Sequence, residues 1–179
     1  MDPRKTLTAF DQYLAAAKLR LDAVVIGGTA LNLLGIVSRA TDDCDILHPS
    51  LPPVITAAAR AFAVDVRSRG QVLADDWLNN GPASLANQLP VDWQTRLRPV
   101  FSGTAIQLRC LGREDLLRSK LFALCDRGID IGDCLALAPT RDELRTIGPW
   151  VEAQDTNPNW PAHVQATLDD VAKRLGHGF

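Results

Sequence analysis

The chain lacks most of the sequence features that mark metal-binding, secreted or membrane proteins. Its four cysteines form no CxxC pair and have no histidine at ligand spacing, so we expect neither a zinc site nor disulfides. Apolar neighbours surround each cysteine, which is typical of small buried thiols. The first residues show no basic stretch followed by an apolar one, so we expect no leader sequence, and the longest apolar run, residues 24–37, is too short to cross a membrane. We therefore expect a cytoplasmic protein that makes no membrane contact.

A strong charge of either sign is also missing. The formal net charge is -2, which argues against a protein that coats DNA or RNA in bulk. Basic residues are concentrated between Arg96 and Arg127, a segment that contains seven of them and only three acidic residues. This concentration indicates either a local surface for phosphates or a solvated helix face. The three histidines show no spacing typical of a catalytic triad, so a serine hydrolase gains no support.

The apolar residues, in contrast, are numerous enough for a folded core. They make up 46% of the 179 residues, and their spacing predicts strands mixed with helices first and helices alone afterwards. We predict an α+β fold, with a small mixed β-sheet flanked by helices and a C-terminal helical part. Residues 1–111 would form the α/β core, and residues 112–179 the helical part, packed on the core as one unit.

The expected elements follow from periodicity and from turn residues. In the first part we expect helices at 5–20, 29–35 and 52–62, strands at 23–26, 43–47 and 63–66, an irregular region at 70–99 and a hairpin at 99–111. In the second part we expect helices at 114–125, 130–137 and 162–175, and one that begins at a Thr140–Glu143 capping box. Pro149, Asn157-Pro158 and Pro161 are expected to interrupt helices.

Gly27-Gly28 lies between the first strand and the helix that follows it. Two glycines let the chain turn sharply and approach a ligand without Cβ obstruction, and the following helix could present free N–H groups to a phosphate. A simple structural turn is the alternative.

Asp43 and Asp45 alternate on the second predicted strand, so both should point to one face and Cys44 to the other. Neighbouring carboxylates repel each other unless a cation or a proton intervenes. Oxygen-only ligation favours Mg²⁺, which often takes one or two protein carboxylates together with substrate phosphates. A solvated edge-strand face would show the same pattern.

Lys120 emerges from an apolar stripe of its helix, since its neighbours three and four residues away are all apolar. Such a lysine either extends along the surface to reach water or lines a cleft. Arg113 and Arg127 lie seven residues away on either side and share that side of the helix. Arg127 could alternatively offset the helix dipole.

Taken together, these residues resemble a known signature. The stretch from Val24 to Leu47 reads VVIGGTALNLLGIVSRATDDCDIL, which resembles the DNA polymerase β-like nucleotidyltransferase superfamily. Within that superfamily it is similar to the AbiEii/AbiGii toxin-type bacterial branch, whose members often read GGTAL…R.T.DiD. A second block over 111–137 resembles the same branch's eDLl..Kl.A…R..D..D pattern.

This resemblance implies the nucleotidyltransferase fold and an activity. The activity would be transfer of a nucleotidyl group from an NTP to a hydroxyl of RNA or protein, with Mg²⁺ as the cofactor, as two ions or one. Asp43 and Asp45 would be the catalytic and metal-binding residues. The nucleotide would be bound by residues of both blocks: Gly27, Gly28, Thr29, Arg39, Thr41, Lys120 and Arg127. Asp130 and Asp133 would support Lys120 or Arg127, although a stabilising charge at a helix N-terminus explains them equally.

The toxin-type resemblance also implies a possible partner, an antitoxin protein. One departure from the superfamily pattern concerns a third carboxylate, which usually lies on a later strand. The predicted hairpin offers Gln107 and Arg109 instead, and Asp65 and Asp92 are the nearest acids. Either one of these acids serves, or the protein holds one metal ion, or it is a catalytically silent nucleotide-binding or interaction module with the same fold.

Overall fold

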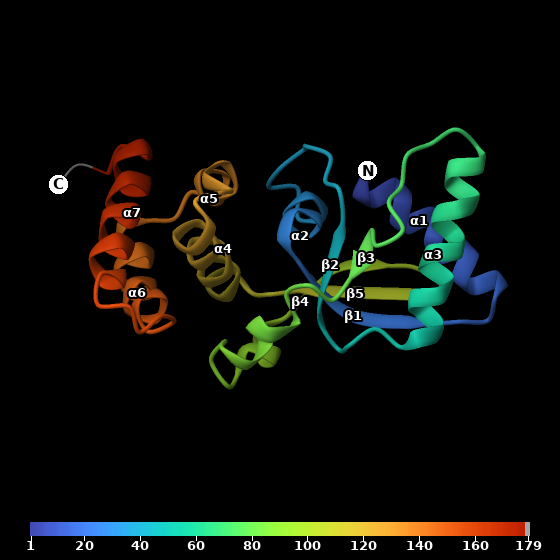
Figure 1. Ribbon diagram of the computed structural model, residues 1–179, viewed down its shortest axis with the longest axis horizontal. Coiled ribbons are helices and arrows are strands. Elements are labelled where there is room, and N and C mark those ends of the chain that lie inside the picture. The colour runs from blue at the N-terminus through green and yellow to red at the C-terminus, as the bar shows by residue number, and fades with distance from the viewer. Residues whose placement is uncertain (178–179) are drawn as a thin grey trace. The chain divides into compact units, whose positions relative to one another are not determined.

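The computed structural model describes residues 1–177, and the chain divides into two compact units, Met1–Leu111 and Gly112–Phe179 (Figure 1). The first unit is built on a five-stranded sheet in the order β3-β2-β1-β5-β4. Its strands are β1 Leu21–Ile26, β2 Cys44–His48, β3 Leu78–Asn79, β4 Arg98–Ser102 and β5 Ile106–Cys110. The sheet is mixed, because β1 pairs antiparallel with β2 and parallel with β5. The α+β fold predicted from the sequence is therefore confirmed.

Three helices accompany this sheet: α1 Pro3–Ala16, α2 Gly27–Leu33 and α3 Pro53–Ser68. Alternate residues of β1 and β5 pack with the apolar faces of α1 and α3 in one core cluster. Phe10, Phe62 and Trp77 form its aromatic centre, with ring centroids 5.1 Å apart between Phe10 and Trp77. The indole N–H of Trp77 donates to the Ala59 carbonyl at 3.1 Å, so the irregular region after α3 is attached to the core.

Two short 3-10 helices, at Ala83–Asn87 and Trp93–Arg96, lie in this irregular region. The 63–66 strand predicted from the sequence is wrong, since α3 continues to Ser68. The reason is that Ala59, Phe62 and Ala63 continue the buried helical stripe that begins at Ile55, and this spacing outweighs a short β-branched pattern. The predicted 99–111 hairpin is confirmed by β4 and β5.

A buried carboxylate joins α1 to the turn of this hairpin. Asp11 is only 8% exposed, and its two oxygens accept hydrogen bonds from the backbone N–H groups of Thr104, Ala105 and Ile106 at 2.8–3.0 Å. Burial opposes ionisation of this carboxyl, but the three donors outweigh burial, so the pKa of Asp11 is lowered. Asp11 therefore fixes a turn that lies 93 to 95 positions further along the chain.

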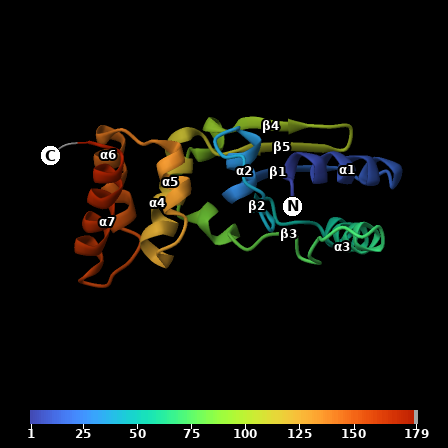
Figure 2. The same ribbon diagram turned by 90° about the horizontal axis from the view of Figure 1, so that it is seen from above.

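The second unit consists of four helices over the residues that the structure describes. They are α4 Arg113–Arg127, α5 Ile131–Leu137, α6 Arg141–Glu152 and α7 Trp160–Arg174 (Figure 2). Fully buried aliphatic side chains such as Leu117, Ile147 and Val164 supply its core. Pro149, expected to interrupt a helix, lies inside α6. The last turn persists because Val151 is fully buried and its carbonyl accepts from the Trp160 indole N–H at 2.9 Å.

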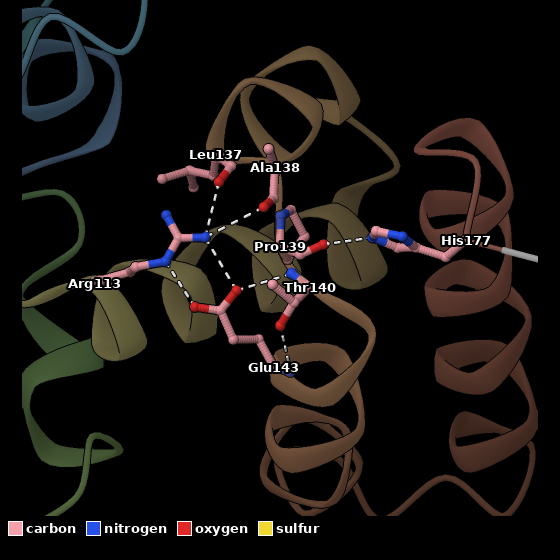
Figure 3. A network of polar contacts seen from close by, with 7 residues as sticks. All are labelled: Arg113, Leu137, Ala138, Pro139, Thr140, Glu143 and His177. Atoms are coloured by element: carbon pink, nitrogen blue, oxygen red, sulfur yellow. Dashed lines mark hydrogen bonds and ion pairs between the residues drawn. The ribbon is translucent and has the colours of Figure 1, made fainter.

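A polar network closes the ends of these helices (Figure 3). Arg113 forms an ion pair with Glu143 at 2.6 Å and also donates to the Leu137 carbonyl at the end of α5 at 3.0 Å. The Glu143 carboxylate accepts from the Thr140 backbone N–H, and the Thr140 hydroxyl oxygen accepts from the Glu143 backbone N–H. The predicted capping box is therefore confirmed. The side-chain partners of Arg113 thus lie in the helical unit itself. Its hydrogen bonds lower the pKa of Glu143 to about 2.

Over residues 1–177, no helix combines the length and apolar character needed to span a bilayer.

Candidate functional site

The Gly-Gly turn and the Asp43–Asp45 segment lie against each other. Ile26, the last residue of β1, is paired with Asp45 on β2, and Gly27 follows at once with a left-handed backbone of φ +70°. A Cβ atom at Gly27 would lie 2.7 Å from Asp45 Oδ2, which is closer than such atoms can approach. The chain therefore needs glycine here for both reasons, the positive φ and the adjacent carboxylate.

Arg39 and Thr41 lie at the second glycine of the turn. A Cβ atom at Gly28 would be 3.1 Å from Thr41 Oγ1 and 3.7 Å from Arg39 Nη2. Asn32, on the exposed side of α2, donates to the Arg39 carbonyl at 3.1 Å and so helps to hold this loop. The loop therefore places the guanidinium group of Arg39, an exposed residue, beside the half-exposed Gly-Gly turn.

Asp43 is held through its backbone. The Thr29 hydroxyl donates to the Asp43 carbonyl at 2.7 Å, and Thr41 Oγ1 lies 3.4 Å from the same carbonyl and 3.5 Å from Asp43 Oδ1. Thr41 is in turn tied to Met1, whose carbonyl accepts from the Thr41 N–H at 3.1 Å. Contrary to the sequence prediction, β2 begins at Cys44, so Asp43 precedes the strand and its position depends on these threonines.

The burial of these residues follows the expected alternation. Cys44 is fully buried, whereas Asp43 and Asp45 on either side are half-buried. Burial and the two neighbouring carboxylates raise the pKa of the Cys44 thiol, which favours its neutral form. The charge of this segment is therefore carried by two accessible carboxylates.

The chemistry of these donors fits a Mg²⁺ ion. They are hard oxygen ligands, their side chains are accessible, and their backbone is fixed by hydrogen bonds before any ligand arrives. They also lie beside a glycine turn and a cation, where phosphate oxygens could complete the coordination of an ion.

The acids considered for the third carboxylate are all engaged elsewhere. Asp65 lies on α3, not on a strand, and pairs with Arg69 at 2.6 Å. Asp92 precedes a 3-10 helix and pairs with Arg96 at 2.5 Å. On β5, Gln107 and Arg109 are exposed, and Arg109 pairs with Asp22 at 2.9 Å. Within residues 1–177, no group of three or more His, Cys, Asp or Glu side chains could hold a metal ion.

In the helical unit, Lys120 is enclosed between two carboxylates. Its ammonium group donates to Asp133 at 2.6 Å and lies 3.3 Å from Asp130, and its side chain is only 6% exposed. Lys120 therefore does not extend to the solvent, and Asp130 and Asp133 do lie around it. Arg127, at the end of α4, is exposed. The nucleotide contacts assigned to Lys120 and Arg127 stay predictions.

Sequence reasoning missed two asparagines that follow Trp77. Asn80 donates to the Ile46 carbonyl at 2.8 Å and accepts from the Leu51 N–H at 2.6 Å, so it fixes the end of β2. Asn79 lies on β3, in register with Asp45. The sequence signal was only a turn motif, Asn-Asn-Gly-Pro, and a strand of two residues leaves no periodicity to detect.

A comparison with protein families places the chain in a known group. A family model described as a nucleotidyltransferase of unknown function (DUF6036) matches residues 5–136. The chain belongs to this nucleotidyltransferase family. The match covers the whole first block and all but the last residue of the second, so the superfamily resemblance is confirmed. No curated protein and no solved structure gave a significant match.

Proposed function

We propose that this protein is a Mg²⁺-dependent nucleotidyltransferase that moves a nucleotidyl group from an NTP to a hydroxyl of RNA or protein. The observation that carries this proposal is the close approach of Gly27 to the Asp45 carboxylate, which brings the Gly-Gly backbone turn and a candidate cation ligand together. Membership of a nucleotidyltransferase family supports the same reaction class.

In the proposed reaction, the acceptor hydroxyl oxygen bonds to the α-phosphorus of the NTP. The bond between that phosphorus and the oxygen bridging to the β-phosphate breaks, pyrophosphate leaves with the bonding electrons, and the hydroxyl proton passes to solvent. Asp43 and Asp45 would hold the Mg²⁺, which when bound neutralises phosphate charge. The Gly27–Thr29 backbone would approach the triphosphate closely, and Arg39 would contact its phosphate oxygens as a planar donor.

We further propose that the protein acts as the toxin of a toxin–antitoxin pair. The support for this finer assignment is the GGTAL and R-x-T-x-D-x-D pattern shared with the AbiEii/AbiGii toxin-type branch. An antitoxin protein would then be its partner. Expression in a bacterial host should arrest growth, and Asp45→Asn should relieve the arrest. Equal growth arrest by both forms would contradict a toxin role that depends on catalysis.

One observation favours a second candidate function, a catalytically silent nucleotide-binding module. It is that, within the described residues, no third acid joins the Asp43–Asp45 pair in a group that could hold a metal ion. Such a module would bind an NTP with Mg²⁺ but transfer nothing.

Incubation with each α-labelled NTP, Mg²⁺ and a cell extract distinguishes these functions. The enzyme should transfer label to a macromolecule, and nuclease or protease treatment then tells whether the acceptor is RNA or protein. Asp45→Asn should abolish the transfer, while the control Asp65→Asn, which removes a carboxylate from the solvent-facing pair at the end of α3, should retain it. NTP binding by calorimetry without transfer would favour the silent module. Absence of any NTP binding would contradict both functions.

A further inference from the structure

In the sheet β2 lies between β1 and β3 (Figure 1). Strand β3 carries a further oxygen donor, Asn79. Strands β2 and β3 run parallel, with Cys44 in register with Leu78 and Asp45 in register with Asn79. Cys44 and Leu78 are both buried in the core of the first unit. Because side chains alternate along a strand, Asp45 and Asn79 both turn away from that core and are neighbours on the opposite face of the sheet.

The amide of Asn79 is fixed in one orientation. Its Oδ1 accepts from the Gly81 N–H at 2.6 Å, and its Nδ2 donates to the Asp76 carbonyl at 3.4 Å. A Cβ at Gly81 would lie 2.9 Å from Asn79 Oδ1, so glycine permits this close turn. An amide oxygen has two acceptor positions, and the Gly81 hydrogen bond uses one of them. Asn79 therefore carries a neutral oxygen donor, held by the Gly81 N–H, at the position in register with Asp45.

We propose that Asn79 supplies the third protein oxygen of the Asp43–Asp45 cation site, where a third carboxylate would otherwise stand, and that the site holds a single divalent ion. This inference rests on the proposed function. Amide oxygens are ordinary ligands of hard cations. They add no negative charge, so in the absence of nucleotide the Asp43 and Asp45 carboxylates together balance the charge of one divalent ion.

The strand on the far side of β1 offers no competing acidic ligand. β5 is the next strand beyond β1, and its outward residues in register with Asp22 and Val24 are Gln107 and Arg109. Arg109 carries a positive charge and is paired with Asp22. That strand provides no carboxylate for a second ion, which leaves β3 as the neighbour that contributes a ligand.

Binding of Mn²⁺ to the full chain, followed by the electron paramagnetic resonance signal of the free ion, tests the proposal without any need for activity. We expect about one Mn²⁺ per chain, because two carboxylates balance the charge of one divalent ion. Asn79→Ala should weaken binding and Asn79→Asp should strengthen it, each by about tenfold, a change typical of altered metal surroundings. Aspartate can accept the same Gly81 hydrogen bond, so Asn79→Asp keeps the local turn. The matched control Gln107→Glu adds the same charge on β5 and should leave Mn²⁺ affinity unchanged.

The variants separate two kinds of failure. If Asp45→Asn binds Mn²⁺ as well as the unaltered chain, the metal site of the proposed function is wrong. If Asp45→Asn loses the ion but both Asn79 variants bind it as the unaltered chain does, the carboxylate pair stands and the role of Asn79 is overturned. Two ions per chain would overturn the single-ion assignment.

Discussion

Gly27 and Gly35 both have a left-handed backbone, with φ of +70° and +74°, but they differ in what lies around them. A Cβ at Gly27 would meet the Asp45 carboxylate at 2.7 Å, whereas a Cβ at Gly35 would meet nothing within 4 Å. An alanine at either position should cost about 1 kcal/mol of unfolding free energy for its backbone conformation. Gly27→Ala should cost a further 1 kcal/mol or so, because Asp45 must move from its position.

Urea unfolding of Gly27→Ala and Gly35→Ala measures this difference. Mn²⁺ binding should be weakened in Gly27→Ala alone, since only this variant displaces a cation ligand. Equal losses of stability and unchanged Mn²⁺ binding in both variants would contradict a contact between the turn and Asp45.

Lys120 presents a different case, a charge that is buried with its partners. Replacing it with methionine would leave Asp133, which is 2% exposed, without its closest cation. We expect Lys120→Met to lower the unfolding free energy by about 3 kcal/mol, as removal of one member of a buried ion pair generally does. Adding Asp133→Asn should recover much of this loss. Thermal and urea unfolding of the two single variants and the double variant measure the coupling.

Arg127→Met is the matched control, because Arg127 is exposed at the end of the same helix. Its unfolding free energy should change by less than about 0.5 kcal/mol. If the predicted phosphate contact of Arg127 is correct, NTP affinity should nevertheless fall in this variant. A large loss of stability in Arg127→Met would show that the comparison does not isolate burial.

At the scale of elements, the Arg113–Glu143 pair joins the start of α4 to the start of α6 (Figure 3). The hydrogen bonds from Arg113 lower the folded-state pKa of Glu143 from 4.5 to about 2. A lowered folded-state pKa stabilises the fold above the unfolded-state pKa, and this stabilisation is lost as the pH falls from about 4.5 towards 2. Glu143→Gln should therefore be less stable than the unaltered chain at neutral pH, by about 1 kcal/mol or less for a partly exposed pair.

Urea unfolding from pH 7 to pH 3 should show the two proteins converging in stability as the pH falls below about 4.5. Glutamine can still accept from the Thr140 N–H, so the helix cap is kept. Asp142→Asn is a control, because Asp142 pairs with Arg145 at 88% side-chain exposure and should have little effect. A stability difference that stays constant down to pH 3 would contradict the assigned pKa.

Local patterns predicted the elements well where they were long or had a specific cap. The Thr140–Glu143 capping box and the 99–111 hairpin are examples, because each depends on residues close in sequence. The prediction was wrong for residues 63–66, where a β-branched pattern lies within a longer helical stripe. The contacts of Gly27 with Asp45 agree with the sequence hypothesis, but the pairing of β2 with the two-residue β3 could not be predicted, since it depends on residues 34 positions apart.

At the scale of the whole molecule, every candidate cation ligand lies in the first unit, which has its own apolar core. We expect a fragment of residues 1–111 to unfold cooperatively and to bind Mn²⁺ with an affinity close to that of the full chain. Urea unfolding followed by tryptophan fluorescence, together with Mn²⁺ titration, tests this expectation. A fragment that unfolds cooperatively but does not bind the ion would show that residues beyond 111 are needed for the site.

The Asp11 carboxylate has a consequence for how the chain reaches this structure during synthesis. Its three backbone donors lie at residues 104–106, so α1 is complete long before its acceptor site can be occupied. Until then a charge that is buried in the folded protein must remain in water, which keeps α1 from its final place in the core. Because contacts of such long range form slowly, the first unit should close in a late step, after the ribosome has released the β4–β5 hairpin.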